Sequence, residues 1–487
     1  LFKYIGILLQ CIQKSFYLTT TSEQQALKSD YLKMLKSDNQ HLFIGALPVD
    51  LQHINCIEIP DNLFDKITEP NIILDYAVCP KIDGERALMY VDKRGECYLI
   101  TRSNDTGMRK VGMNIGQKYA NSLFDGEYLE YDMDGELSNK LILFDCYVIS
   151  GKVMIDTVFG DDKSGEGTRY HHIKQLENYY KGNNNDITVM NGLSKYAFKL
   201  GFIQYLFGEK SVRKVKNHQL IFQQSASLLN KMNKRYGGTL EEGHLFSFPT
   251  DGLIFMPTNR PLYNFQICDA SGNNRAMICN RKVASYFKWK PLDNLTIDFR
   301  VNFIKTSKKE RVIHYENGKK YAEVALKCRN YDSFVYNKSG RQTVSSNISS
   351  YLVNENRNLY KEPEEVNFIS VQPFQGFRDV KGTIHNTLYT AYLLVNDDNN
   401  ICCLNGDIIY DNDVVEFAYD INGELLDKQD VYKRWKPERV RPGKVPNALN
   451  TAIDIWKLIH YNLSTDNVMN GLTMKDMNNI SNSYNLQ

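Results

Sequence analysis

Three aspartate–glycine pairs that stand beside short apolar runs constrain the fold of this chain more than any other feature. The pairs are Asp83-Gly84, Asp125-Gly126 and Asp251-Gly252. Around them, short runs rich in Val, Ile, Tyr and Phe are separated by turn residues, which is the pattern of short β-strands. Two lysines, Lys288 and Lys290, follow within another such run, and alternation along a strand places both on one face. The pattern predicts a β-rich domain with charged groups at its strand edges.

Composition leaves the class of protein open, but it argues against a globally charged surface for nucleic acid and against a membrane-spanning segment. The 487 residues are 42% hydrophobic and 24% charged, as in ordinary globular proteins, and the length suggests roughly two to four domains. The net charge of +2 creates no global field toward nucleic acid, so any RNA contact must be local. The ten cysteines include no Cys-x-x-Cys pair, which favours free thiols in a reducing compartment. No apolar run is long enough to cross a bilayer, so we expect no membrane contact.

The segment Lys-Ile-Asp-Gly-Glu-Arg at residues 81–86 has two interpretations. One is a surface hairpin, because Asp-Gly between two alternating runs is a strong type I′ turn signal. The other makes Lys81 a nucleophile. An amine attacks only when neutral, and burial or nearby positive charge lowers the pKa of a lysine. On this reading the chain must bring cations close to Lys81, and Lys288 and Lys290 are the candidates.

The acids beside the glycines suit a metal bound to a nucleotide phosphate. Asp125, Glu127 and Asp251 each lie at the edge of an apolar run. Carboxylate oxygens of this kind are the ligands that Mg²⁺ prefers. One aspartate–glycine pair alone is weak evidence for a site. Three such pairs followed by Lys288 and Lys290 are less easily explained by chance.

In this order the segments resemble the signature motifs of the covalent nucleotidyltransferases, the superfamily of capping enzymes and ATP- or NAD-dependent ligases. Residues 81–86 look like the nucleophile motif, and residues 125–127 with 141–147 look like the third motif and its companion strand. Residues 251–254 and 288–290 follow in the family's order. Residues 435–447, Trp-Lys-Pro-Glu-Arg-Val-Arg-Pro-Gly-Lys-Val-Pro-Asn, are similar to the capping-specific sixth motif, one residue shorter and with Gly443 in place of its Asp.

Further segments resemble the large capping enzymes of poxviruses, other giant cytoplasmic DNA viruses and yeast linear plasmids. They are residues 43–49, 287–299 and 447–460. The resemblance implies an α+β fold: a ligase-like nucleotidyltransferase domain with antiparallel sheets, unrelated to ATP-grasp, and then an OB-fold β-barrel. We expect residues 1–50 to end an upstream module, residues 51–297 to form the nucleotidyltransferase domain, 298–447 the OB-fold, and 448–487 a linker. The start at Leu1 suggests a piece of a longer polypeptide.

The resemblance implies an mRNA guanylyltransferase in which Lys81 attacks GTP, forms a lysyl-GMP intermediate and passes GMP to a 5′-diphosphate RNA. Asp251 would help hold Mg²⁺ or Mn²⁺. The other roles carry over to residues that contact GTP: Arg86, Arg102 and Glu127 at the ribose, Phe144 and Ile254 around guanine, Lys288 and Lys290 at the α-phosphate, and Arg441 and Lys444 at the β- and γ-phosphates. Because the family's Asp is thought to position pyrophosphate, we expect Gly443→Asp to raise the rate of adduct formation.

The same resemblance implies partners and a location. The partners are GTP, diphosphate-ended RNA, a small regulatory subunit, and triphosphatase and cap methyltransferase domains on the same polypeptide. The location is cytoplasmic, in a viral factory, virion or plasmid system. Two alternatives stay open: an ATP-dependent polynucleotide ligase, and a catalytically weak homologue that only binds RNA or a partner.

Overall fold

The computed structural model describes residues 19–35, 42–57, 70–101, 107–132, 135–182, 187–189, 197–210, 219–232, 246, 248–262, 267–268, 274–275, 282–329, 365–367, 390–421, 433–460, 462–473 and 476. The chain divides into two compact units. The first comprises Leu1–Lys290 with Thr465–Asn478, and the second comprises Pro291–Ser464 with Asn479–Gln487. The expected boundary after residue 297 falls seven residues further along, inside a strand of the second unit.

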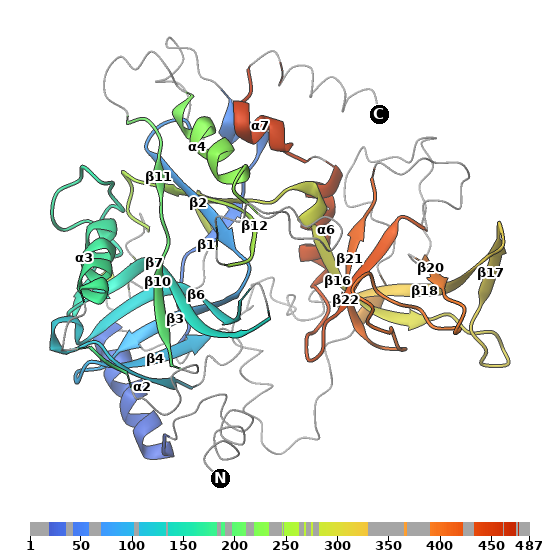
Figure 1. The fold of residues 1–487 in the computed structure, drawn as a ribbon, viewed down its shortest axis with the longest axis horizontal. Helices are drawn as coiled ribbons and strands as arrows, with labels where there is room; N and C mark the ends of the chain where they lie inside the picture. The colour runs from blue at the N-terminus through green and yellow to red at the C-terminus, as the bar shows by residue number, and fades with distance from the viewer. Residues whose placement is uncertain are drawn as a thin grey trace. The chain divides into compact units, whose positions relative to one another are not determined.

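A five-stranded sheet in the first unit carries the nucleophile segment (Figure 1). Its order is β1 (Leu47–Asp50), β15 (Lys282–Trp289), β12 (Thr250–Pro257), β2 (Tyr76–Ile82) and β11 (Leu206–Phe207). The central strand β12 pairs antiparallel with β2 and β15, and β1 joins β15 in parallel. The sheet therefore brings together segments from both ends of the first unit.

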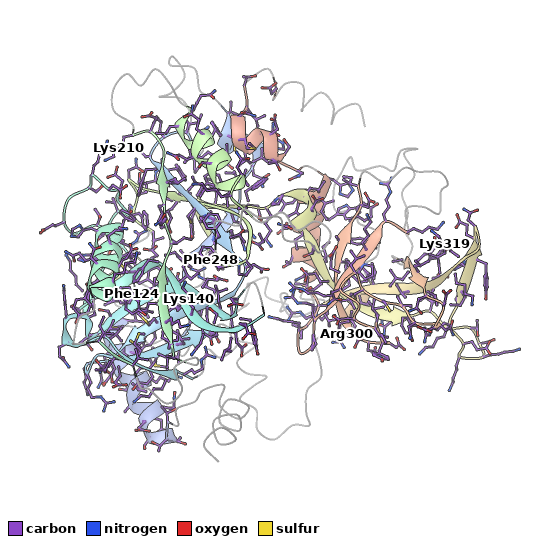
Figure 2. The ribbon with its side chains drawn as sticks, viewed as in Figure 1. Phe124, Lys140, Lys210, Phe248, Arg300 and Lys319 are labelled. Carbon is purple, nitrogen blue, oxygen red and sulfur yellow. The ribbon has the colours of Figure 1, made fainter. Side chains whose placement is uncertain are left out.

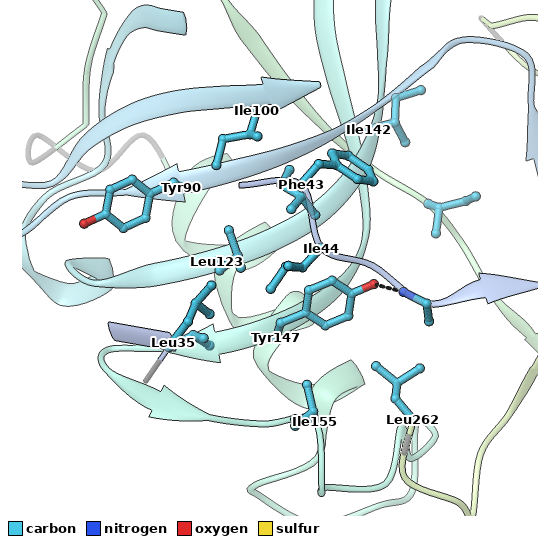
Figure 3. Close-up of a cluster of buried hydrophobic side chains, with 14 of the residues drawn as sticks. Leu35, Phe43, Ile44, Tyr90, Ile100, Leu123, Ile142, Tyr147, Ile155 and Leu262 are labelled. Carbon is cyan, nitrogen blue, oxygen red and sulfur yellow. Dashed lines mark hydrogen bonds between the residues drawn. The ribbon is translucent and has the colours of Figure 1, made fainter. Parts of the chain in front are cut away.

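An eight-stranded sheet forms the rest of that unit. Its order is β10 (Lys199–Phe202), β7 (Leu137–Ile149), β6 (Ser122–Tyr131), β3 (Glu85–Val91), β4 (Glu96–Thr101), β5 (Arg109–Asn114) and β9 (Thr188–Val189), with β8 (Lys152–Val153) on β7. A short pair, β13 (Ile267–Cys268) and β14 (Asn274–Arg275), stands apart. One face of the eight-stranded sheet supplies Tyr90, Leu123 and Ile142 to a large apolar cluster, in which Phe43 and Ile44 of the segment before β1 also lie (Figure 3).

The hairpin reading of residues 81–86 is wrong. Strand β2, which ends at Ile82, belongs to the five-stranded sheet, whereas β3, which begins at Glu85, belongs to the eight-stranded sheet. Asp83 and Gly84 therefore carry the chain from one sheet to the other. The turn signal was real, but the two flanking runs pair with different partners.

Two helices of the first unit begin where a side chain accepts a hydrogen bond from a free backbone N–H group. Helix α2 (Thr21–Leu35) begins after Thr20, whose hydroxyl accepts a bond from the Glu23 N–H at 3.2 Å while Glu23 accepts from the Thr20 N–H at 2.7 Å. Thr20 is therefore the cap of this helix. Helix α3 (Arg169–Lys181), which the sequence analysis missed, is capped by Thr168. Helices α4 (Leu220–Leu229) and α7 (Thr465–Asn470) pack on each other.

The second unit is an antiparallel sheet with its own core. Its strands are β17 (Ile313–Glu316), β18 (Lys319–Arg329), β16 (Thr296–Phe303), β21 (Val414–Tyr419) and β22 (Trp435–Val440) in that order, with β19 (Glu365–Asn367) and β20 (Thr390–Val395) also on β18. Helix α6 (Leu449–His460) buries Ala452, Trp456 and Ile459 in this core. Residues 449–460, expected to be linker, are therefore part of the second unit.

The predicted α+β class with mainly antiparallel sheets is confirmed, while the specific OB-fold assignment stays a prediction. Three 3₁₀ turns complete the described elements: His53–Cys56, Gln117–Tyr119 and Leu292–Asn294. Among the described residues, no helix is long and apolar enough to span a membrane.

Candidate active site

The glycines of the three aspartate–glycine pairs all lie where another strand's backbone comes close. A Cβ on Gly252 would come within 2.0 Å of the Trp289 carbonyl oxygen, so only glycine lets β12 lie this close to β15. A Cβ on Gly84 or Gly126 would likewise come within 2.7 Å of a carbonyl oxygen on a neighbouring strand. The pairs are therefore close-approach positions, and each aspartate is held beside a tightly packed strand edge.

Asp251 bridges two lysines from the strands on either side of it. Its Oδ1 accepts a hydrogen bond from the Lys81 Nζ at 2.8 Å, and its Oδ2 lies 2.6 Å from the Lys290 Nζ. The register explains the first contact, because Gly252 of β12 lies opposite Lys81 of β2. Lys290 directly follows β15, the other neighbour of β12. The sheet thus joins the expected nucleophile, metal ligand and phosphate ligand in one cluster.

The charge state of Lys81 differs from the sequence expectation. Burial acts to lower its pKa, but Asp251, through its charge and hydrogen bond, together with Glu127 outweighs burial, so the pKa lies above the ordinary value. Burial would raise the pKa of Asp251, yet Lys81 and Lys290 hold it below its usual range. In the unliganded protein Lys81 is therefore an ammonium ion paired with a carboxylate. The expected lowering of the Lys81 pKa by nearby cations does not occur, because the Asp251 carboxylate lies between Lys81 and Lys290.

Lys288 has a different partner, which the sequence analysis missed. Its Nζ lies 3.1 Å from Oδ1 of Asp50, and the two residues lie opposite each other in the parallel pairing of β1 with β15. Both side chains are about one-third exposed, at 36% and 30%. The only sequence signal was the position of Asp50 at the end of a short apolar segment. No local pattern could have indicated that this strand pairs with one some 230 residues away.

Asp125 is a structural residue and not a metal ligand. Its side chain is fully buried and accepts bonds from Arg86, whose Nε lies 3.1 Å from Oδ1, and from the hydroxyl of Tyr147. The same guanidinium donates to the Ala46 carbonyl at 2.7 Å. The Tyr147 hydroxyl also accepts from the Ala46 N–H at 3.2 Å, the bond drawn in Figure 3. Since the carboxylate oxygens are enclosed by these donors, Asp125 fixes the orientation of Arg86.

Glu127 is an acid of this region whose pKa is shifted toward neutral pH. Burial raises its pKa to about 7, against the opposing effect of Lys81 and Arg86. It lies opposite Arg86 in the β3–β6 pairing. The arrangement puts a carboxyl group that is part protonated at neutral pH beside the cationic groups, where a ribose hydroxyl could use it as donor or acceptor.

The two residues expected to enclose guanine are both partly exposed at the edge of the large apolar cluster. Phe144 lies on β7 and Ile254 on β12, so they come from different sheets. The Arg86 guanidinium carbon lies 5.6 Å from the centre of the Phe144 ring, within cation–π range. The backbone carbonyl of Phe144 accepts from the Tyr205 hydroxyl at 3.0 Å. These contacts hold the ring in place without covering it.

Arg441 and Lys444 lie in the second unit, at the two ends of a β-turn. The Lys444 N–H donates to the Arg441 carbonyl at 3.1 Å, Pro442 is the second residue, and Gly443 has φ of +70°. Proline followed by a residue with positive φ defines a type II turn, and glycine is the residue that adopts such φ without strain. Gly443 therefore has a backbone reason to replace the family's aspartate. A Cβ there would meet no atom within 4 Å, so the space for a side chain is open.

Glu416 holds the arginine of this turn. Its Oε2 accepts bonds from Arg441 and Arg439, each at 2.5 Å, and its Oε1 accepts from the Thr296 hydroxyl at 2.6 Å. Burial opposes ionisation, but these bonds and charges lower the pKa of Glu416 to about 2. Asn447 anchors the far side of the motif, since it exchanges two hydrogen bonds of 2.8 Å with the backbone of Asp298. No pattern in the sequence indicated Glu416.

One expected ligand, Arg102, lies outside the described residues, as does most of the basic stretch at 210–216. Within the described part of the chain, no group of three or more His, Cys, Asp or Glu side chains could hold a metal ion. Asp251 is the carboxylate that contacts both Lys81 and Lys290. A single carboxylate is nevertheless what a magnesium ion shared with substrate phosphates requires, since Mg²⁺ usually keeps several waters and binds few protein groups.

Comparison with known proteins gives a consistent family. The family model described as mRNA capping enzyme, catalytic domain, matches residues 16–270, which is 255 of the 487 residues. The probable mRNA-capping enzyme of Acanthamoeba polyphaga mimivirus is 24% identical over 437 residues, covering 80% of this chain and 31% of the relative. The alpha subunit of the mRNA-capping enzyme of Saccharomyces cerevisiae is 25% identical over 304 residues, covering 57% of this chain and 52% of the relative.

The counterpart alpha subunit from Eremothecium gossypii is 24% identical over 299 residues, covering 56% of this chain and 51% of that protein. Among solved structures, the ligase domain of LigD from M. tuberculosis covers 79% of this chain and 97% of its own, with 14% identity and a TM-score of 0.25. The chain thus spans under a third of the mimivirus relative and about half of each yeast relative.

Proposed function

Because this chain belongs to the family of mRNA capping enzyme catalytic domains, we propose that it is an mRNA guanylyltransferase. Lys81 Nζ attacks the α-phosphorus of GTP, a nitrogen–phosphorus bond forms, and the bond to the β-phosphate oxygen breaks with release of pyrophosphate. The terminal phosphate oxygen of a 5′-diphosphate RNA then attacks the same phosphorus, the nitrogen–phosphorus bond breaks, and the Lys81 amine is restored. Covalent catalysis divides one difficult transfer into two.

The observation that carries this proposal is the position of Asp251 between Lys81 and Lys290, with Oδ1 at 2.8 Å from one ammonium and Oδ2 at 2.6 Å from the other. In the resting protein the Asp251 carboxylate forms an ion pair with the protonated Lys81. This ion pair must weaken before Lys81 can lose its proton and attack. Arrival of a divalent cation at Asp251 would weaken its attraction for Lys81. The lysine pKa would then fall under the remaining effect of burial.

Mg²⁺ or Mn²⁺ would be held by Asp251 together with the phosphates of GTP, and it would supply charge neutralisation at the reacting phosphate. This chain's own groups perform the other tasks. Lys290 and Lys288 bind the α-phosphate oxygens as their negative charge grows, and preorganised cations in a partly dry site are worth several kcal/mol of barrier. Arg86, fixed by Asp125, and Glu127 orient the ribose.

We propose GTP and not ATP as the donor because residues 435–447 are similar to the sixth motif of capping enzymes. Arg441 and Lys444, at the two ends of the type II turn, would bind the β- and γ-phosphates, and Glu416 accepts a hydrogen bond from Arg441. Among the families that the chain resembles, this segment distinguishes capping enzymes from ligases. Phe144 and Ile254 would enclose the guanine ring, and Arg102 would add a ribose contact.

Diphosphate-ended RNA is the proposed acceptor, and a small regulatory subunit is a proposed partner, because two relatives are named as alpha subunits. Triphosphatase and methyltransferase domains on the same polypeptide are a further proposal, since the mimivirus relative is about three times as long as its matched part. We place the reaction in a reducing, cytoplasmic compartment, because the seven cysteines whose side chains the structure describes are free thiols.

The test is incubation with α-labelled GTP or ATP and a divalent metal, followed by denaturing electrophoresis. We expect a protein-bound label from GTP that survives base and is lost in acid, as a phosphoramidate does, and none from ATP. Lys81→Arg keeps the charge beside Asp251 and serves as the matched control for Lys81→Ala. Neither variant should retain label. Label from ATP alone would support a ligase, and no label from either nucleotide would overturn the enzymatic reading.

A further inference from the structure

Two lysines of the eight-stranded sheet lie side by side at its edge. Lys140 of β7 is the register partner of Lys199 in the parallel pairing of β7 with β10. Lys140 is partly buried and Lys199 is exposed. Figure 2 labels Lys140, which lies on β7, the strand next to the edge strand β10. Like charges directly opposite each other in a sheet are destabilising, so this pairing needs a reason.

Both lysines lie on the sheet face that bears the proposed nucleotide site. Along β7 the side chains of Ile142 and Phe144 belong to the large apolar cluster, whereas Leu141 and Leu143 belong to the separate core on the other face. Alternation therefore puts Lys140 on the face of Phe144. On β10, Leu200 belongs to the other core, so its neighbour Lys199 also faces the nucleotide side.

Within the described residues, no ion pair joins Lys140 or Lys199 to an acid. Burial lowers the pKa of Lys140, and Lys199 adds to that effect. Gly201 makes room for the Lys140 side chain, because a Cβ at that position would come within 2.7 Å of Lys140 Cε. In the part of the chain that the structure describes, the two lysines thus lie on adjacent strands, one of them partly buried, with no acid paired to either.

The register gives the separation from the nucleotide site. Ile142 of β7 lies opposite Glu127 of β6, which lies opposite Arg86 of β3. Lys140 is two residues beyond Ile142, so it lies about 10 Å across the sheet and about 7 Å along the strands from Arg86. A single-stranded RNA whose first phosphates enter the site could reach this distance within a few nucleotides.

We propose that Lys140 and Lys199 form a subsite for backbone phosphates of the RNA acceptor, a few nucleotides from its 5′ end. The proposal rests on the proposed guanylyltransferase function, since it concerns the second step of that reaction. An RNA backbone is the polyanion that fits, because it supplies successive phosphates to a pair of fixed cations. The subsite would hold the acceptor chain without reading its sequence.

The experiment separates the two steps. The double variant Lys140→Gln/Lys199→Gln and the original protein are first loaded with labelled GMP and freed of GTP. Transfer is then measured to a diphosphate-ended RNA of about 20 nucleotides and to a diphosphate-ended dinucleotide, over a series of salt concentrations. Lys152→Gln is the matched control, because Lys152 is an exposed lysine of the same sheet, on β8 at the other end of β7. Lys199→Arg retains the charge and should behave like the original protein.

For the long RNA, we expect the double variant to need about tenfold more acceptor at low salt, and its plot of log affinity against log salt to be shallower by about 1.4, or 0.7 for each lost phosphate contact. Transfer to the dinucleotide should not change, because that acceptor cannot reach the subsite. Equal affinity and equal slope for the long RNA would overturn the inference even if adduct formation is normal. If no adduct forms in the original protein, the proposed function fails, and direct binding of the long RNA to both proteins still decides the subsite.

Discussion

Replacing Asp251 by Asn tests whether this carboxylate keeps the resting Lys81 charged. The substitution retains the size of the side chain and removes its negative charge. In the original protein the Lys81 Nζ lies 2.8 Å from Asp251 Oδ1, and the two side chains are 23% and 13% exposed. Because the charge and hydrogen bond of Asp251 are the main influences that raise the Lys81 pKa against burial, their loss should let that pKa fall.

The distance sets the size of the expected fall. Two unit charges 2.8 Å apart attract by about 1.5 kcal/mol in bulk water and by about 6 kcal/mol at an effective dielectric constant of 20. The partial exposure of both groups puts this pair between those limits. Asp251→Asn removes this attraction, so the ammonium form of Lys81 should lose at least about 1.5 kcal/mol of stabilisation and the pKa of Lys81 should fall.

The assay is competitive labelling of lysines with an amine-selective acylating reagent, without nucleotide or metal, read by mass spectrometry of the peptides. Lys152, an exposed lysine on β8, serves as the reference within the same molecule. At mildly alkaline pH the labelling of Lys81 relative to Lys152 should rise at least about tenfold in the variant, the rate change for a shift of one pKa unit. Adduct formation from GTP should nevertheless fall, because the proposed metal ligand is lost. An unchanged pH profile of Lys81 labelling would refute the reasoning.

Three further predictions concern Glu416, Glu127 and Gly443. Glu416 has its pKa lowered to about 2, so the stability it contributes is present above the unfolded value of about 4.3 and is lost as pH falls toward 2; Glu416→Gln should remove that dependence from acid unfolding followed by tryptophan fluorescence. Glu127 has its pKa raised to about 7, so stability should decline as pH rises from about 4.3 to 7, and urea unfolding of Glu127→Gln should lack this decline. At Gly443, with φ of +70°, both Asp and Ala should cost about 1 kcal/mol in thermal unfolding, and only Asp should raise the rate of GMP-adduct formation if a carboxylate there aids pyrophosphate release.

The sequence predicted the local features of the site well, because they depend on short-range patterns. Alternation along a strand placed Lys288 on a β-segment with buried aromatic neighbours, and Phe287 and Trp289 are indeed buried. Asp251-Gly252 was recognised as an acid at a strand edge, and the structure adds that glycine is required by the approach of the Trp289 carbonyl.

What the sequence could not supply is the pairing between distant segments. The partner of Lys288 is Asp50, and the partner of Arg441 is Glu416, and neither has a local signal, since a lone acid on a short strand is usually a solvated side chain. The hairpin error has the same origin. A turn signal at Asp83 describes the bend of the chain but not which sheet each flanking strand joins.

The feature hardest to predict from sequence was the direction of the Lys81 pKa shift, because it depends on whether an acid or a cation lies nearer to Lys81. Motif reasoning placed both an acid and cations around the lysine, and a nucleophile needs the cations to dominate. The sheet order β2–β12–β15 decides the matter, since it inserts the strand of Asp251 between those of Lys81 and Lys290. An order that placed β15 directly beside β2 would bring Lys290 nearer to Lys81, and its positive charge would then act to lower the Lys81 pKa. In the proposed mechanism, a metal ion that competes for Asp251, or a phosphate that competes for Lys290, would have to weaken the Lys81–Asp251 ion pair before Lys81 could lose its proton.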